Sequence, residues 1–226
     1  MTIARESLAR MIEEINVRLE SGDAPSATER TEAVSRILGH QVEVGRNAGA
    51  FAPTGRDLAA GVRLWTGEVL RTTHAKWSLL TTEAARLVLL LGASDGAGGA
   101  SVARARSWLD ASCFASRGCT AGECAHSLIG YLRLLATQGE EPDRMGRCLS
   151  GIRHRRDGRG RWSGFPFYYT ILALSESAIP AAAAELSYAQ GACERVGTPR
   201  ARDPRIRDRR CRLMDGVLAA SVKRLL

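Results

Sequence analysis

The sequence predicts an all-α protein, and three observations carry that prediction. Apolar residues recur at steps of three and four along most of the 226-residue chain, which is the period of a helix with one buried face. Several of these segments begin with Ser or Thr followed three residues later by an acidic residue, the spacing of a helix capping box. Prolines stand at expected first turns, and glycines stand just beyond expected helix ends.

The first third of the chain is expected to hold three helices. An amphipathic stripe predicts the first helix over Ile3–Leu19. Capping-box pairs, Ser26 with Glu29 and Thr54 with Asp57, begin the second and third helices. The second is expected to end before a glycine, and the stripe of the third continues to residue 70.

A nearly all-apolar helix over Ala84–Leu91, capped by Thr81 or Thr82, is expected to form the centre of the core. The glycine-rich stretch 92–99 after it favours turns and disfavours a continuing helix. We therefore expect a single helical domain over residues 1–226, with a possible hinge or subdomain boundary at 92–99.

The second half of the chain continues in the same way. Thr120 with Glu123 has capping-box spacing and is expected to begin a helix with a buried leucine-rich face. Pro166, Pro180 and Pro204 are each placed to open a further helix.

Grouped in pairs, the expected helices make five hairpins, over residues 3 to 38, 55 to 92, 100 to 137, 142 to 176 and 180 to 226. A regular spacing of about 40 residues is typical of stacked helical hairpins, in which each unit covers the apolar face of its neighbour. The spacing predicts consecutive helical hairpins in an α/α toroid-like or α-solenoid arrangement, with an irregular helical domain as the alternative.

Composition and charge restrict the kinds of partner and cellular location that the sequence supports. The net charge is +8 and comes almost wholly from arginine, since Lys76 and Lys223 are the only lysines. A basic surface raises the chance of an anionic partner such as nucleic acid, which is possible here but not favoured. The N-terminal residues lack the pattern of a signal or transit peptide, and the longest strongly apolar run, Leu87–Gly92, is too short to span a membrane. We expect a cytoplasmic protein with free thiols.

The segment Asp157–Thr170 reads DGRGRWSGFPFYYT, an Asp-Gly turn and a tryptophan followed by an apolar helix. It resembles the turn-plus-helix unit of the prenyltransferase and squalene-cyclase repeat superfamily, and Asp95–Gly99 is similar to a worn copy of the same turn. The resemblance implies an α/α toroid whose central cavity holds isoprenoid chains. The glutamine that accompanies the tryptophan in that superfamily is missing, as are its Asp-rich motif and its zinc-binding Asp-x-Cys pair, so the resemblance implies architecture and not chemistry.

Aromatic side chains around this turn are the candidates for lining a ligand cavity, with simple core packing as the alternative. They are Trp162, Phe165, Phe167, Tyr168 and Tyr169. No catalytic motif is evident, and the preferred function is binding of a hydrophobic small molecule or peptide in an apolar cavity. An isoprenoid-type transferase or cyclase relative is the first alternative.

Two arginine runs flank expected helix ends, and guanidinium groups bind phosphate and carboxylate bidentately. The candidates for an anion site are Arg153, Arg155, Arg156, Arg205 and Arg209. If both runs lie on one face, the protein is a nucleic-acid-binding helical repeat, the second alternative; otherwise they form a solvated surface partly neutralised by nearby aspartates.

A cluster of Cys113, Cys119, Cys124 and His126 offers the ligand types of a zinc site. Structural zinc sites usually supply a Cys-x-x-Cys pair, which is absent, and a regular helix beginning at Thr120 would turn Cys124 and His126 to opposite sides. The sequence therefore predicts no bound metal and no cofactor, with the cysteines acting as small buried hydrophobes.

Overall fold

A computed structural model describes residues 6–139 and 141–222. Within these ranges the chain forms eleven helices and no strands, only isolated bridges, so the all-α prediction is confirmed. The helices are α1 (Leu8–Glu20), α2 (Ala27–Leu38), α3 (Gly55–Ala60), α4 (Thr73–Leu90), α5 (Gly96–Asp110), α6 (Cys113–Ser116), α7 (Cys124–Gln138), α8 (Pro142–Arg153), α9 (Phe167–Ser175), α10 (Pro180–Val196) and α11 (Pro204–Val222). No helix among them is both long and apolar enough to cross a membrane.

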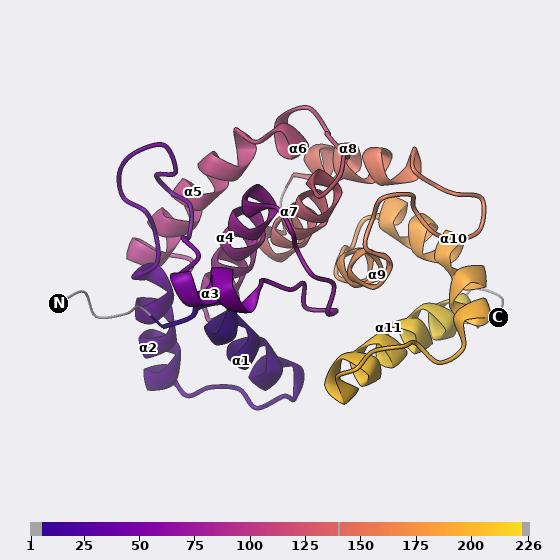
Figure 1. Cartoon of the computed structure of the whole chain (residues 1–226), viewed down its shortest axis with the longest axis horizontal. Coiled ribbons are helices and arrows are strands. Elements are labelled where there is room, and N and C mark those ends of the chain that lie inside the picture. The colour runs from indigo at the N-terminus through magenta and orange to yellow at the C-terminus, as the bar shows by residue number, and fades with distance from the viewer. Residues whose placement is uncertain (1–5, 140, 223–226) are drawn as a thin grey trace.

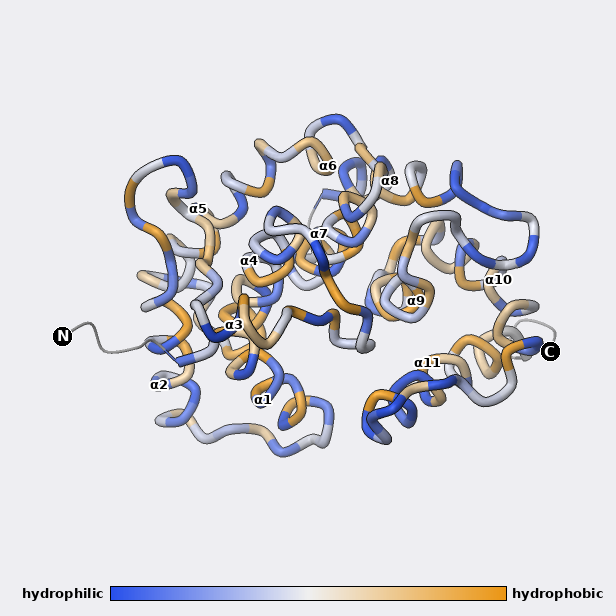
Figure 2. Tube along the Cα trace, in the orientation of Figure 1, coloured by the Kyte–Doolittle hydropathy of each residue, from blue (hydrophilic) through white to orange (hydrophobic). Residues whose placement is uncertain are grey.

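Helices α4, α7 and α9 form the interior of the molecule (Figure 1). Helix α4 packs on α7, and α7 packs on α9. Helices α5, α8 and α10 cover them along one side, each packed against the interior helix that precedes it in the sequence, while α1 contacts α4 and α11 contacts α9 on the other side. Apolar residues concentrate on the interior helices, and the loop between α8 and α9 is strongly hydrophilic (Figure 2).

The hairpin expected over 180 to 226 is confirmed, because α10 packs against α11. Other packed pairs differ from the hairpins expected from spacing: α4 packs with α5, α7 with α8 and α9 with α10, whereas the expected pairs over 100 to 137 and 142 to 176 would join α5 to α7 and α8 to α9. The shift arises because α4 is one long helix. Its buried side chains, together with those of every other long helix, belong to one core cluster that includes residues on both sides of the turn before α5.

The predicted central helix is confirmed as core, but its predicted start is wrong. Ala84 and Leu87 are fully buried, as expected. Helix α4 begins eleven residues before Ala84, however, with Thr72 as its N-cap, and Thr81 and Thr82 are buried in its interior. The Thr72 hydroxyl accepts a hydrogen bond from the Ala75 N–H at this start, and a distant side chain, described below, also helps to cap it.

The helical stripe predicted over 58–70 is wrong after its first residues. The capping box of Thr54 and Asp57 is confirmed. Helix α3 then ends at once, because Gly61 takes a left-handed backbone with φ of 81°, which favours glycine. Residues 61–72 form a loop pinned by an isolated antiparallel bridge, and this loop becomes one wall of the cavity described below.

Two other helix starts also differ. Helix α1 begins at Leu8, with Ser7 as its cap; residues 3–5 of the expected first helix lie outside the described residues. Helix α7 begins at Cys124 with Glu123 as N-cap, so the Thr120 cap is wrong. The predicted starts at Ser26, Pro180 and Pro204 are confirmed, as is a helix directly after Pro166.

Candidate functional site

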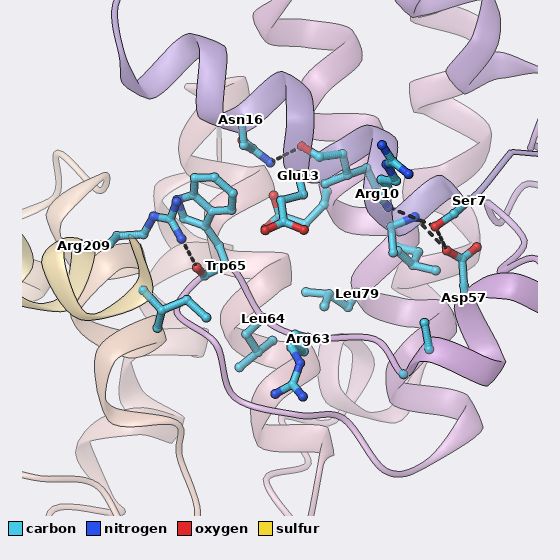
Figure 3. A pocket seen from close by; sticks show the side chains of 17 residues that line it. Ser7, Arg10, Glu13, Asn16, Asp57, Arg63, Leu64, Trp65, Leu79 and Arg209 are labelled. Atoms are coloured by element: carbon cyan, nitrogen blue, oxygen red, sulfur yellow. Dashed lines mark hydrogen bonds between the residues drawn. The ribbon is translucent and has the colours of Figure 1, made fainter. Parts of the chain in front are cut away.

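A cavity of about 250 Å³ lies where α1, α3, the 61–72 loop, α4 and α11 meet (Figure 3). Its apolar lining includes Ile12, Leu64, Trp65, Leu79, Leu80 and Ile206. The carboxylate of Glu13 faces the cavity from α1, across from Leu64 and Leu79 (Figure 3). The walls are therefore mostly hydrophobic, with a few acidic and basic groups placed among them, which is the composition typical of small-molecule sites.

One wall is Trp65, which α11 holds in place. The guanidinium carbon of Arg209 lies 3.3 Å from the centre of the indole ring, and Arg209 Nη1 donates a hydrogen bond of 2.7 Å to the Trp65 carbonyl. The same guanidinium pairs with Glu20 of α1 at 3.1 Å. Arg209 thus covers one face of the indole and ties the loop to two helices.

Asp57 anchors the opposite end of the cavity, at the start of α1. Its carboxylate accepts hydrogen bonds from the Ser7 hydroxyl, from the Leu8 and Ala9 N–H groups, and from the N–H and hydroxyl of Thr54. One side chain therefore caps both α1 and α3. Burial alone would raise the pKa of Asp57, but the hydrogen bonds from Ser7, Thr54 and Ala9 outweigh it and hold the pKa below its usual range.

The cavity reaches a buried ionic network through Glu83 of α4. Glu83 Oε1 accepts a 2.7 Å hydrogen bond from the Tyr169 hydroxyl and another from Arg133 Nη1. Arg133, from α7, also pairs with Glu176 at 2.7 Å, at the end of α9. Only 5% of the Glu83 side chain and 2% of the Arg133 side chain is exposed, so three interior helices are joined by charges removed from water.

The second oxygen of this carboxylate lacks a hydrogen bond. Glu83 Oε2 is buried and finds no hydrogen-bond partner among the described residues; the Arg86 guanidinium approaches it only to 3.9 Å. An unsatisfied buried carboxylate oxygen is costly, and such atoms in native structures call for an explanation such as a bound ligand.

Of the five aromatic residues expected to line a ligand cavity, Trp162, Phe167 and Tyr168 pack on one another, and none of the five lines this cavity. Trp162 packs with Phe167, with ring centres 6.2 Å apart, and donates a 2.9 Å hydrogen bond to Glu185 of α10. Phe165 is buried beside that turn, Tyr168 lies under Arg210, and the fully buried Tyr169 reaches the Glu83 network.

The five candidate arginines lie at or just after the C-terminal end of α8 and on α11, and two of them pair with a glutamate, of which only Glu185 is buried. Arg156 pairs with Glu185 at 2.9 Å, and Arg209 pairs with Glu20 as described. Arg155 donates to the Thr120 hydroxyl, while Arg153 and Arg205 are exposed. The structure therefore joins Arg156 to the Trp162 turn and Arg209 to the cavity, on separate elements.

Three cysteines, one at the start of α6, one in the connection after it and one at the start of α7, come together, and His126 is not part of their group. The Sγ atoms of Cys113, Cys119 and Cys124 all lie within 4.8 Å of one another. A hydrogen bond from the Ala121 N–H lowers the pKa of Cys119, whereas burial and then the neighbouring thiols raise the pKa of Cys124 to about 12. The convergence arises because α7 begins at Cys124, not at Thr120.

Comparison with known proteins identifies no similar family, protein or structure. No protein-family model matches the chain, and neither a search of curated proteins nor a search of solved structures finds a match. The likeness of residues 157–170 to the prenyltransferase and squalene-cyclase repeat superfamily thus rests on that segment alone.

Among the residues that line the cavity, Arg209 alone was a candidate site residue from the sequence. Glu83 carried a usable signal, since it is the single acidic residue in a helix otherwise apolar on most sides, and such a charge is almost always paired or functional. Trp65 carried none, because the stripe that contained it was assigned to a helix that does not form.

Proposed function

We propose that the protein binds a small, mainly hydrophobic molecule with a hydrogen-bond donor in the cavity between α1, α4 and α11. The observation that carries the proposal is the combination of apolar walls with one buried carboxylate oxygen, Glu83 Oε2, that lacks a hydrogen bond. Glu83 is among the residues that line the cavity, so a hydroxyl or ammonium group of the ligand that displaces the side chains covering Oε2 would satisfy that oxygen, and Leu64, Trp65 and Leu79 would contact the apolar body.

The size of the cavity favours a small molecule over a peptide. Its volume of about 250 Å³ falls just below the range of roughly 300–1,000 Å³ typical of sites for drug-sized ligands. The donor preference follows from charge: Arg133 and Tyr169 already saturate Glu83 Oε1, so the carboxylate is held in place and its other oxygen can only accept.

The arrangement of the helices around one another is a further part of the proposal. We propose an incomplete α/α ring, supported by the succession of contacts from α4 to α7 to α9 inside and by the second layer of α5, α8 and α10. The partner of Trp162 adds support, because Glu185 binds its indole N–H where the similar superfamily uses glutamine. A cytoplasmic location is proposed from the six cysteines, all of them free thiols.

A pair of fluorescent probes tests the binding proposal. 2-Naphthol carries a hydroxyl donor on an apolar body, and 2-methoxynaphthalene has the same rings without the donor. We expect the full-length protein to bind 2-naphthol at least about tenfold more tightly, because a hydrogen bond to a charged group contributes about 1.5–3 kcal/mol. Fluorescence titration measures both affinities.

Matched variants on one helix locate the binding site. Ala60 lines the cavity at an exposed position of α3, so Ala60→Phe should cover its opening and abolish binding of both probes. Ala59→Phe adds the same bulk at an exposed neighbour outside the lining and should leave both affinities unchanged. Equal affinities for the two probes, or binding that survives Ala60→Phe, would overturn the proposal.

A further inference from the structure

We infer that Cys113, Cys119 and Cys124 form a binding site for a thiophilic metal ion, zinc being the best fit, with a fourth coordination position open to solvent. The site is separate from the cavity: none of the three cysteines lines it. It also runs against the absence of zinc predicted from the sequence, and the structural reason is specific.

The spacing of the thiols is that of ligands around one ion. Cys113 Sγ and Cys124 Sγ lie 3.6 Å apart, and Cys119 Sγ completes a triangle with no side longer than 4.8 Å. Zinc–thiolate bonds of about 2.3 Å in a tetrahedron place neighbouring sulfurs roughly 3.8 Å apart. The bond between two disulfide sulfurs is far shorter, about 2.05 Å, so Cys113 and Cys124 are not disulfide-bonded, and their separation is close to that of two sulfurs on one zinc ion.

The chain is built locally to bring the three thiols together. Cys113 opens α6 and Cys124 opens α7, and the connection between them folds back through Gly118 and Gly122. Both glycines have positive φ, 64° and 52°, which side chains disfavour. A hydrogen bond from the Cys119 N–H to the Cys113 carbonyl at 3.2 Å closes the turn. These contacts hold the triangle without the Cys-x-x-Cys spacing that sequence reasoning required.

The ligand set selects the kind of metal. Three thiolates favour soft or borderline ions such as zinc and exclude calcium and magnesium, which take oxygen ligands. All three cysteines are partly exposed, so water or an added thiol can reach the ion. Three protein ligands with one open position is the pattern of zinc sites that bind or activate a further ligand, whereas purely structural sites are closed by four.

Cobalt substitution on the reduced full-length protein tests the site. We expect one Co²⁺ per chain, with the intense visible bands of tetrahedral cobalt and a thiolate-to-cobalt charge-transfer band, and displacement of that cobalt by one Zn²⁺. Single substitutions Cys113→Ser, Cys119→Ser and Cys124→Ser should each weaken zinc binding by more than about 100-fold, beyond the 10–100-fold typical of changes around a site. Cys211→Ser, at a similarly half-exposed cysteine, is the control and should bind as the unchanged protein does.

A second measurement needs no variant and so does not depend on how well the variants fold. Zinc should protect Cys113, Cys119 and Cys124 from alkylation, as read by mass spectrometry of peptides, and should leave Cys211 as reactive as before. Alkylation of all six cysteines at rates independent of zinc, octahedral cobalt spectra, or a loss of binding in Cys211→Ser equal to that in Cys119→Ser would overturn the inference.

Discussion

At the scale of single residues, the molecule uses carboxylates to fix its interior. Glu83 binds Tyr169 and Arg133, Glu185 binds Trp162 and Arg156, and each carboxylate is almost fully buried. Burial of a carboxylate is tolerated only with such partners. Glu83 differs from Glu185 in leaving one oxygen without a hydrogen bond. In our proposal Glu83 therefore binds a ligand, whereas Glu185 holds a turn in place.

Trp162 allows a direct test of the second role, in which the buried carboxylate of Glu185 holds a turn in place. The indole is 3% exposed, packs on Phe167 and Tyr188, and donates to Glu185. The burial predicted from the sequence is therefore confirmed. Trp162→Ala should lower the free energy of unfolding by about 3–5 kcal/mol, the usual cost of removing a large buried aromatic side chain. Urea denaturation measures it, and a change below roughly 0.5 kcal/mol, the range of surface substitutions, would show that the indole is not part of the core.

At the scale of elements, several helix boundaries are set by distant side chains. Glu123, the N-cap of α7, turns its carboxylate to the Arg71 and Thr72 N–H groups and to the Thr72 hydroxyl, and so caps α4. Burial would raise the pKa of Glu123, but these hydrogen bonds lower it. Asp57 does the same for α1. Each carboxylate stabilises the start of a helix that lies about 50 residues away in the sequence.

The Asp57 cap predicts a specific pH dependence. Its native pKa is lowered, so its contribution is fully present above the unfolded pKa of about 3.9 and is lost as pH falls through the lower native value. Asp57→Asn, which leaves a helix N–H or hydroxyl unsatisfied, should cost about 1–3 kcal/mol near neutral pH. The difference from the unchanged protein should hold down to about pH 4 and shrink below it.

Thermal unfolding across this pH range measures the difference. Asp208→Asn is the control, because Asp208 is exposed and, among the described residues, its one ion pair is with its neighbour Arg207, at 3.8 Å. A constant difference at every pH for Asp57→Asn would contradict an ionised cap, since the effect of the substitution would then not depend on the charge of Asp57.

The sequence predicts a helix start correctly where the capping residues lie within one turn of it, and incorrectly where the capping group comes from a distant residue. The capping box at Ser26 and the proline starts at Pro180 and Pro204 are confirmed because their partners lie within one turn. The helix start predicted at Thr120 is wrong, although the helix itself forms as α7, because the Glu123 carboxylate binds the start of α4 instead of its own first turn. The wall formed by the 61–72 loop was equally hidden, since Arg209 fixes it from α11, more than a hundred residues away.

At the scale of the whole molecule, the cavity exists because distant elements meet around an interior that is already packed. Helices α4, α7 and α9 supply the ionic network, and α1, the 61–72 loop and α11 enclose the space beside it. The two ends of the chain are joined there through Glu20 and Arg209. Ligand binding in this cavity would therefore also stabilise the ion pairs that join α1 to α11, by mass action on the folded state.

A crystal structure of the full-length protein with 2-naphthol tests the central claim most directly. Our account predicts the ring against Trp65 and Leu79, with the hydroxyl oxygen within about 2.5–3.0 Å of Glu83 Oε2, the range of such hydrogen bonds. A probe bound elsewhere on the surface, with Glu83 Oε2 hydrogen-bonded to Arg86 inside an otherwise unaltered cavity, would contradict it.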